Sequence, residues 1–142
     1  MLSNEVFDKV YTIVKYAMAD LEIEVNGESV PKWTDLFYAR SSQDLKETEL
    51  PCLYMRQIGA PQIGMDLMRN VQNGVDSTFQ VDTISSNSYD EAYEILNDAG
   101  DIFIRLGYAL TYQQEIPTGN PSLWRFVARF NRVVGANDTL AL

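Results

Sequence analysis

Residues 124–131, WRFVARFN, alternate between two kinds of side chain along the chain. One set is apolar throughout and consists of Trp124, Phe126, Ala128 and Phe130, while the other contains Arg125, Val127, Arg129 and Asn131. Successive side chains of a β-strand point to opposite faces, so this pattern predicts a strand with one packed face and one open face. A chain that contains such a strand must form a sheet and must cover one of its faces.

Two segments have the periodicity of amphipathic helices and could cover the packed face of the sheet. Residues 4–22 repeat apolar side chains about one helical turn apart, with charged residues between them. The second helix is predicted to begin at Ser88, because Ser88 and Glu91 have the S-x-x-E spacing of a capping box. Gly107 is predicted to end it, since glycine readily adopts the left-handed conformation that closes many helices.

Further strands are predicted on both sides of the second helix. Residues 50–58 and 75–84 precede the helix, and residues 110–116 follow it. The short link PTGNP should make 110–116 and the last strand, 123–134, an antiparallel pair.

The order of these elements predicts a single α+β domain over residues 1–142. We expect a small, mostly antiparallel sheet of about four strands with both helices packed on one face. Residues 23–49 have no clear period, and we expect either a short strand near 36–40 within them or a loop that docks on something else. Residues 135–142 are predicted to form a short C-terminal tail.

The alternation pattern also predicts which face of the sheet the side chains occupy in 110–116 and at Arg132 of the last strand. In 110–116, apolar Leu110, Tyr112 and Ile116 alternate with polar residues, which predicts that the apolar set faces the helices. Strict alternation also places Arg132 on the packed face of the last strand. We therefore expect a β-bulge, or the end of the strand, to bring Arg132 to water or to a partner.

The available residue types limit the chemistry of the chain. It has no histidine, which removes Ser-His-Asp and Cys-His catalysis and histidine metal sites. Its one cysteine, Cys52, lies in an apolar segment and is predicted to be an inert core thiol. No Gly-rich phosphate loop is present, and the carboxylates are scattered along the chain. We therefore predict no catalytic, cofactor-binding or metal-binding residues, and a protein that binds and assembles.

The connection between 50–58 and 75–84 is a candidate for a subunit or tube interface. Residues 59–74 are unusually apolar for a connection that lies in water, and methionines make adaptable contact surfaces. The candidate interface residues in this connection are Ile63, Met65, Leu67, Met68 and Arg69. The alternative is that the segment folds back and completes the core.

Arg125 and Arg129 are further interface candidates, because they lie on the polar face of a strand in a chain of net charge −9. They can pair within the chain, with a carboxylate of the adjacent strand such as Glu115, or they can meet acidic side chains of another subunit. In the second case, exchanging both for glutamate should weaken assembly and leave the fold intact. Asp76 and Asp82 are assigned to the solvent or lumen side of the sheet.

Several short motifs of the second half occur in a characteristic order. A strand with the sequence FQVD, 79–82, leads by a polar turn to a helix with the pair Glu91–Ala92, and this helix ends in Leu106–Gly107–Tyr108. Aromatic residues and arginines then alternate in 124–134. In this order the motifs resemble the tail-terminator, or tail-completion, proteins of long-tailed bacteriophages and prophages. LPCLYMRQIGAPQIG is similar to the first-strand region of that family, so the resemblance covers about residues 50–138.

The resemblance implies a structural protein of the virion without enzymatic activity or cofactor. Members of this family form a hexameric ring on the end of the tail tube, stop its polymerisation and offer a docking surface to the head–tail connector protein. The implied partners are therefore copies of the same chain, the tail-tube protein and the connector. DNA passes through the ring without specific binding, and an acidic wall is compatible with this because it repels phosphates. Assembly in the bacterial cytoplasm, with no membrane partner, is expected.

Two other functions remain open at the level of sequence. A tail-tube or head-completion subunit has the same broad character but should polymerise into tubes or bind the portal complex. A small enzyme or ligand-binding domain that uses carboxylates and tyrosines should instead have a deep pocket.

Overall fold

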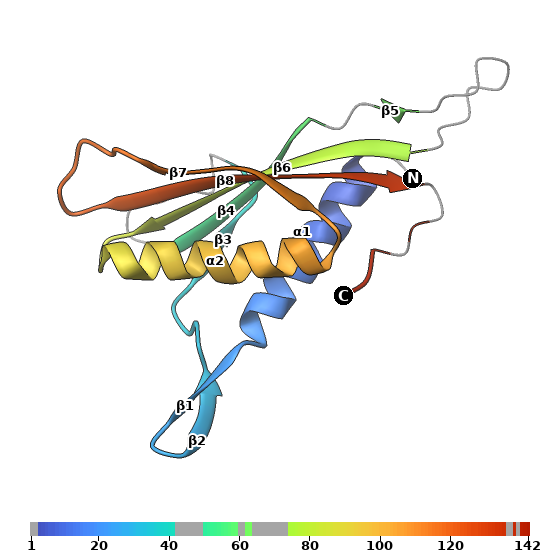
Figure 1. Cartoon of the computed structure of the whole chain (residues 1–142). Coiled ribbons are helices and arrows are strands. Elements are labelled where there is room, and N and C mark those ends of the chain that lie inside the picture. The colour runs from blue at the N-terminus through green and yellow to red at the C-terminus, as the bar shows by residue number, and fades with distance from the viewer. Residues whose placement is uncertain (1–2, 42–49, 60–61, 64–73, 136–137, 139) are drawn as a thin grey trace, which may run out of the picture.

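The computed structural model of the chain is an α+β fold in which two helices lie on one face of a sheet (Figure 1). It describes residues 3–41, 50–59, 62–63, 74–135, 138 and 140–142. In this part of the chain the helices are α1 (Ser3–Ala19) and α2 (Tyr89–Arg105). The strands are β1 (Glu22–Val25), β2 (Glu28–Pro31), β3 (Phe37–Ala39), β4 (Cys52–Gly59), β5 (Gln62–Ile63), β6 (Gly74–Ser85), β7 (Ala109–Ile116) and β8 (Trp124–Gly135). The predicted fold class is confirmed.

The main sheet is larger than the four strands predicted from the sequence. Its strand order is β3-β4-β6-β8-β7, and the short β5 pairs with β6. The pair of β3 and β4 is parallel, whereas the other pairs are antiparallel. The additional strands come from the two segments without a clear period: β3 is the short strand expected near 36–40, and β5 lies in the connection after β4.

A second, two-stranded sheet was not predicted. β1 and β2 form an antiparallel hairpin that projects away from the main sheet and the helices (Figure 1). Asn26 and Gly27 form its turn with φ angles of 53° and 80°, the positive values of the type I′ turn that suits two-residue hairpins. The predicted first helix therefore ends early, at Ala19, because Glu22–Val25 is extended.

The core lies between the helices and one face of the main sheet. Phe79 of β6 packs against Phe7 of α1 at 5.7 Å between ring centroids and against Phe103 of α2 at 5.4 Å. Phe103 also stacks on Phe130 of β8 at 4.8 Å. Phe126, Ala128 and Phe130 are buried in the core and Trp124 packs at its margin, which confirms the predicted packed face of the last strand.

The start of α2 uses one half of the predicted capping box. The Ser88 hydroxyl accepts a hydrogen bond from the backbone N–H of Glu91 at 3.0 Å. The Glu91 carboxylate, however, accepts from the Ser85 hydroxyl at 3.0 Å and from the Asn87 amide at 3.1 Å. The cap therefore joins the helix to the end of β6 as well as closing its own first turn. At the other end Gly107 has a φ of +89°, as the sequence predicts for a residue that closes the helix.

Arg132 corrects the prediction of a bulge in the last strand. β8 pairs with β6 in unbroken register from Gly135 to Trp124, so Arg132 stays on the face with the helices. Its guanidinium donates to the carbonyl oxygen of Leu106 at 2.7 Å and forms an ion pair with Asp138. The last carbonyl groups of a helix have no partner within the helix, so the end of α2 offers acceptors to this cation.

The bulge lies in β7 instead, between Leu110 and Tyr112. Beyond it Glu115 pairs with Phe126 and Tyr112 pairs with Arg129. Directly paired residues share a face, so Glu115 lies on the helix side while Tyr112 and Ile116 lie on the open side. The predicted facing of Tyr112 and Ile116 was wrong, because β7 is an edge strand exposed along almost its whole length and no core contact determines its facing.

Candidate assembly surfaces

A polar network lies on the face of the main sheet opposite the helices, here called the open face. Arg125 of β8 forms an ion pair with Asp82 of β6. Asp82 also accepts from the Gln80 side-chain amide at 3.2 Å, and Gln80 in turn accepts from Arg129 Nε at 3.1 Å. Asp82 and Gln80 at the centre of this network are 1% and 5% exposed, whereas Arg129 at its edge is exposed. The open face is therefore an ordered, hydrogen-bonded surface.

The two carboxylates assigned to the solvent or lumen side differ in exposure. Both lie on the open face, the side assigned to them, but Asp82 is buried beneath its partners. The ion pair with Arg125 supplies the compensation that a buried carboxylate requires. Asp76 is half-buried and accepts from the Asn131 side chain at 2.7 Å. A position in a lumen stays a prediction for both.

Arg125 pairs within the chain, but with a different residue from the one suggested by the sequence. Glu115 cannot reach it, because Glu115 lies on the helix side of β7, and Asp82 takes its place. This contact argues against the expectation that exchanging Arg125 for glutamate leaves the fold intact. Arg125 is 38% exposed and Asp82 only 1%, so losing Arg125 would leave a buried carboxylate without its cation.

Arg129 and Arg56 are the accessible cations of the open face. Each lies over an aromatic ring: Arg129 is 5.3 Å from the centre of Tyr112, and Arg56 is 5.6 Å from the centre of Tyr54. Both side chains are exposed, and neither has an ion pair with a carboxylate among the described residues. The open face therefore presents positive charge on a chain whose net charge is −9.

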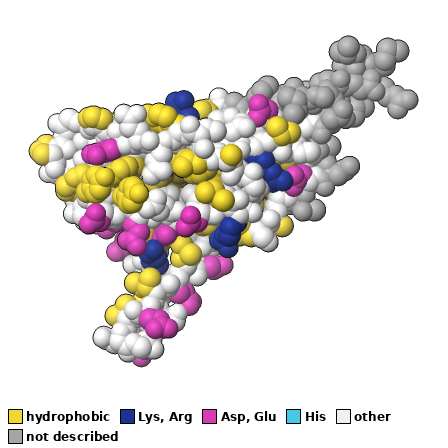
Figure 2. All heavy atoms as spheres, in the orientation of Figure 1, with side chains coloured by type: hydrophobic (Ala, Val, Ile, Leu, Met, Phe, Trp, Pro, Cys, Tyr) yellow, Lys and Arg dark blue, Asp and Glu magenta, His cyan; other side chains and the backbone are white. Residues whose placement is uncertain are grey.

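The β1–β2 hairpin has the opposite character. Its charged residues are Glu22, Glu24 and Glu28, and its apolar residues Ile23 and Val25 are 43% and 46% exposed. Figure 2 shows carboxylates on the projecting hairpin and along the neighbouring part of the body. None of the residues from Glu22 to Pro31 belongs to the core. A two-stranded hairpin without such support is marginally stable in water at best. Ile23 faces Val30 across the two strands, and neither Ile23 nor Val25 packs against the described core.

The base of the hairpin is attached to α2 through Asp98. This carboxylate lies 2.8 Å from Lys32 Nζ and accepts a hydrogen bond from the Trp33 indole at 2.9 Å, while Glu94 lies 3.0 Å from Lys32. Burial alone would lower the pKa of Lys32, but the hydrogen bonds and charges of Asp98 and Glu94 outweigh burial and raise it. The β1–β2 hairpin, also called the arm below, is therefore attached to the body at its base, while residues 22–31 do not pack on the described core.

The candidate interface in the connection after β4 is largely outside the described residues. Met65, Leu67, Met68 and Arg69 lie there, so their part in an interface stays a prediction. Ile63 belongs to β5 and pairs with Gly74 of β6. Its backbone therefore extends the main sheet.

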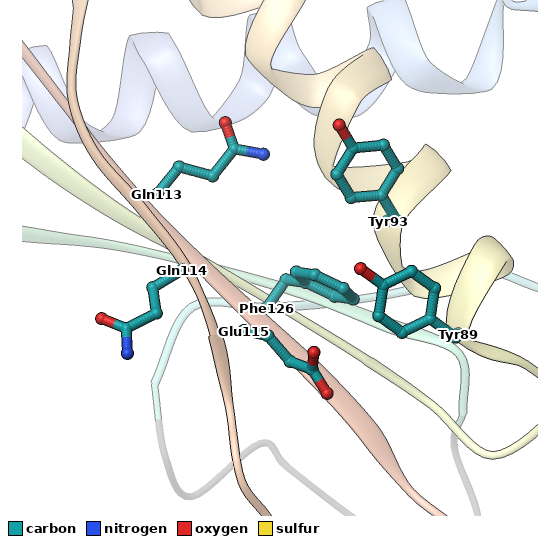
Figure 3. A pocket seen from close by; sticks show the side chains of 6 residues that line it. All are labelled: Tyr89, Tyr93, Gln113, Gln114, Glu115 and Phe126. Carbon is teal, nitrogen blue, oxygen red and sulfur yellow. The ribbon is translucent and has the colours of Figure 1, made fainter.

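A hollow of about 410 Å³ lies between the first turns of α2 and the edge strand β7 (Figure 3). Its lining consists of Tyr89, Tyr93, Gln113, Gln114, Glu115 and Phe126. The two tyrosines come from α2, Phe126 from β8 and the remaining residues from β7. Sequence reasoning missed it, although the spacing of two tyrosines four residues apart was a signal that their rings lie side by side.

Other chemistry is limited in the described part of the chain. Cys52 is buried and forms no disulfide, in agreement with the predicted core thiol. Within the described ranges, no group of three or more carboxylate or cysteine side chains could hold a metal ion. No helix there is long and apolar enough to span a membrane.

Comparison of the sequence with models of known protein families and with curated proteins found no match. The surfaces described above and the ordered motifs of the second half are therefore the features of this chain that bear on its function.

Proposed function

We propose that this chain is a tail-terminator subunit of a long-tailed bacteriophage or prophage, which closes into a hexameric ring on the end of the tail tube and offers a docking surface to the head–tail connector. The observation that carries the proposal is the projecting hairpin, with Ile23 and Val25 exposed and no core of its own. An element of this kind acquires its packing partner on assembly. The ordered motifs from Phe79 to Val134 support a tail-terminator ring as the kind of assembly.

A ring of identical subunits needs two different surfaces that complement each other. In a head-to-tail arrangement, each subunit presents one surface to its neighbour on one side and the other surface to its neighbour on the opposite side. The acidic hairpin and the open face with Arg56 and Arg129 are such a pair by charge. Complementary charge also favours correct orientation over wrong contacts.

Each alternative function predicts an outcome that differs from that of the proposal. A tail-tube subunit should form open-ended tubes, and a head-completion subunit should bind the portal complex and leave tube length unchanged. A small enzyme or ligand-binding domain should stay monomeric or dimeric and bind a small substrate.

The decisive experiment combines light scattering after size exclusion with negative-stain microscopy, on the protein alone and mixed with polymerising tail-tube protein. We expect a closed ring of six copies, in solution or at the ends of tubes, and tubes of limited length. Tubes formed by this chain itself, or tail tubes that grow equally long in its presence, would contradict the proposal. A monomer in solution is informative only together with the tube mixture, since the tube end can template the ring.

A further inference from the structure

The aromatic hollow beside α2 is built from rings that hold one another in place. The rings of Tyr89 and Tyr93 are stacked, with centroids 6.3 Å apart and planes 9° apart. Both meet Phe126 in an edge-to-face manner, at 5.0 Å and 5.5 Å. Tyr89 and Tyr93 are nevertheless 44% and 41% exposed, so the hollow opens to the exterior (Figure 3). It offers a fixed aromatic surface rather than loose side chains.

The lining also contains one negative charge. Glu115 lies beside Phe126 on the helix side of β7 and is exposed. It forms no ion pair with another described residue, and no lysine or arginine contributes to the lining. Gln113 adds a side-chain carbonyl group that can accept a hydrogen bond, whereas the Gln114 carbonyl already accepts from the Tyr112 hydroxyl. Acceptors and negative charge next to aromatic rings are the features that recognise a cation.

The same chain places its own cations over several of its other rings. Arg40 lies 4.9 Å from the centre of Phe7 and 5.0 Å from that of Tyr11, and Arg129 lies 5.3 Å from that of Tyr112. Arg56 and Lys32 are placed in the same way over Tyr54 and Trp33. By contrast, no described lysine or arginine lies over Tyr89, Tyr93 or Phe126. The hollow is an aromatic cluster with a carboxylate whose cation is not supplied from within the described chain.

We propose that this hollow is a binding site for an arginine side chain of a protein partner. The guanidinium plane lies against the tyrosine rings and donates hydrogen bonds to the Glu115 carboxylate. Arginine fits better than lysine, because a planar guanidinium can stack on a ring and pair with a carboxylate at the same time. The site does not depend on the ring proposed above, since it requires only a partner with an exposed arginine.

The test is an NMR titration of the full chain labelled with nitrogen-15. The probe is the blocked tripeptide Gly-Arg-Gly, and the comparison is the same peptide with citrulline, which has nearly the same shape but no charge. We expect the arginine peptide to shift amide signals around Tyr89, Tyr93, Phe126 and residues 113–115, with a dissociation constant in the millimolar range. The citrulline peptide should bind at least five times more weakly.

Two variants separate a specific site from general attraction to an acidic protein. Glu115→Gln should weaken binding of the arginine peptide at least fivefold, whereas Asp101→Asn, which removes an exposed carboxylate of α2 outside the hollow, should leave it unchanged. Both residues are exposed, so both variants should fold, and the dispersion of their amide signals verifies this. Equal losses for the two variants, equal binding of both peptides, or shifts centred elsewhere would overturn the proposal.

Discussion

At the scale of single residues, Arg132 is a charged side chain on the packed face of β8 that binds the C-terminal end of α2 next to Gly107. An atom added as Cβ at Gly107 would lie 3.1 Å from Arg132 Nε. The arginine is held there by the Leu106 carbonyl group and by Asp138. Glycine is therefore favoured at position 107 for two reasons: it adopts the left-handed conformation without strain, and its lack of a Cβ leaves room for the Arg132 side chain.

This arrangement predicts different costs for two glycine substitutions. Gly107→Ala and Gly119→Ala both place alanine at a positive φ, +89° and +72°, which costs about 1 kcal/mol. Open space surrounds the Cβ position at Gly119, whereas Gly107→Ala must also displace Arg132, at a further cost of about 1 kcal/mol. Urea denaturation should show the larger loss of unfolding free energy for Gly107→Ala. Equal losses would mean that Arg132 moves aside freely.

A second prediction at this scale concerns Tyr38. Burial, and then the neighbouring Tyr11, raise the pKa of the Tyr38 phenol to about 12. Because its folded pKa exceeds the ordinary value near 10, this residue stabilises the fold fully below pH 10, and the contribution is lost as pH rises from 10 towards 12. Titration followed by tyrosinate absorbance should show a late step that Tyr38→Phe reduces. Tyr16→Phe, which removes a 66% exposed phenol, should leave that step in place.

At the scale of secondary-structure elements, the hairpin depends on α2 for its position. Asp98 accepts from both Lys32 and Trp33 and so links the base of the arm to the body. The rest of the arm contributes nothing to the core. Local opening of the arm should therefore cost little free energy compared with global unfolding.

Asp98→Asn should weaken the attachment of the β1–β2 hairpin to α2, because Asp98 contacts Lys32 and Trp33 at the base of the hairpin. The loss of the charge on Asp98 should lower the unfolding free energy by about 1 kcal/mol, because a hydrogen-bonded, partly buried ion pair is lost. Hydrogen exchange of the amides in 22–31 should become faster by more than exchange in β6. Asp101→Asn, one turn away on the same helix and exposed, should change neither quantity. Unchanged exchange in Asp98→Asn would show that the hairpin is positioned by its backbone alone.

At the scale of the whole molecule, the distribution of charge is the property that bears on assembly. The acidic arm and the open face lie on different parts of the fold, so neither can neutralise the other within one chain (Figure 1). Arg125 is unsuitable for testing this arrangement, because its exchange would leave Asp82 buried without its partner. Arg56 and Arg129 are suitable, since both are exposed.

The double variant Arg56→Glu with Arg129→Glu should fold normally and fail to close rings. At moderate salt its mass by light scattering should shift from the ring towards the single chain, because two attractive contacts per interface become repulsive. Lys9→Glu with Lys15→Glu makes the same change in net charge on α1 and should assemble like the parent. If both double variants lose the ring equally, net charge rather than the open face governs assembly.

Much of the fold could be predicted because its signals are local. The alternation of β8, the helical period of α1 and α2, the Ser88 cap and Gly107 each depend on a few neighbouring residues, and all five appear in the structure. Local hydrogen bonds and side-chain periods are properties of the segment itself. The hairpin was missed although Asn26–Gly27 is a strong turn signal and Glu22–Val25 alternates between charged and apolar residues, because each strand has only four residues and neither has a buried face.

Other properties were decided only when distant strands came together. The burial of Asp82, its pairing with Arg125 and the direction of Glu115 depend on the register of β6, β8 and β7. The aromatic hollow likewise combines Tyr89 with Glu115, which belong to different elements. A single-residue shift of register turns every side chain of a strand to the other face, so sequence periodicity cannot determine such contacts at an edge strand without a core face. The sequence by itself determined the two helices, the long strands β4, β6, β7 and β8, and which face of the central strands packs. The tertiary structure alone decided which charges meet, which remain exposed and where a partner's side chain fits.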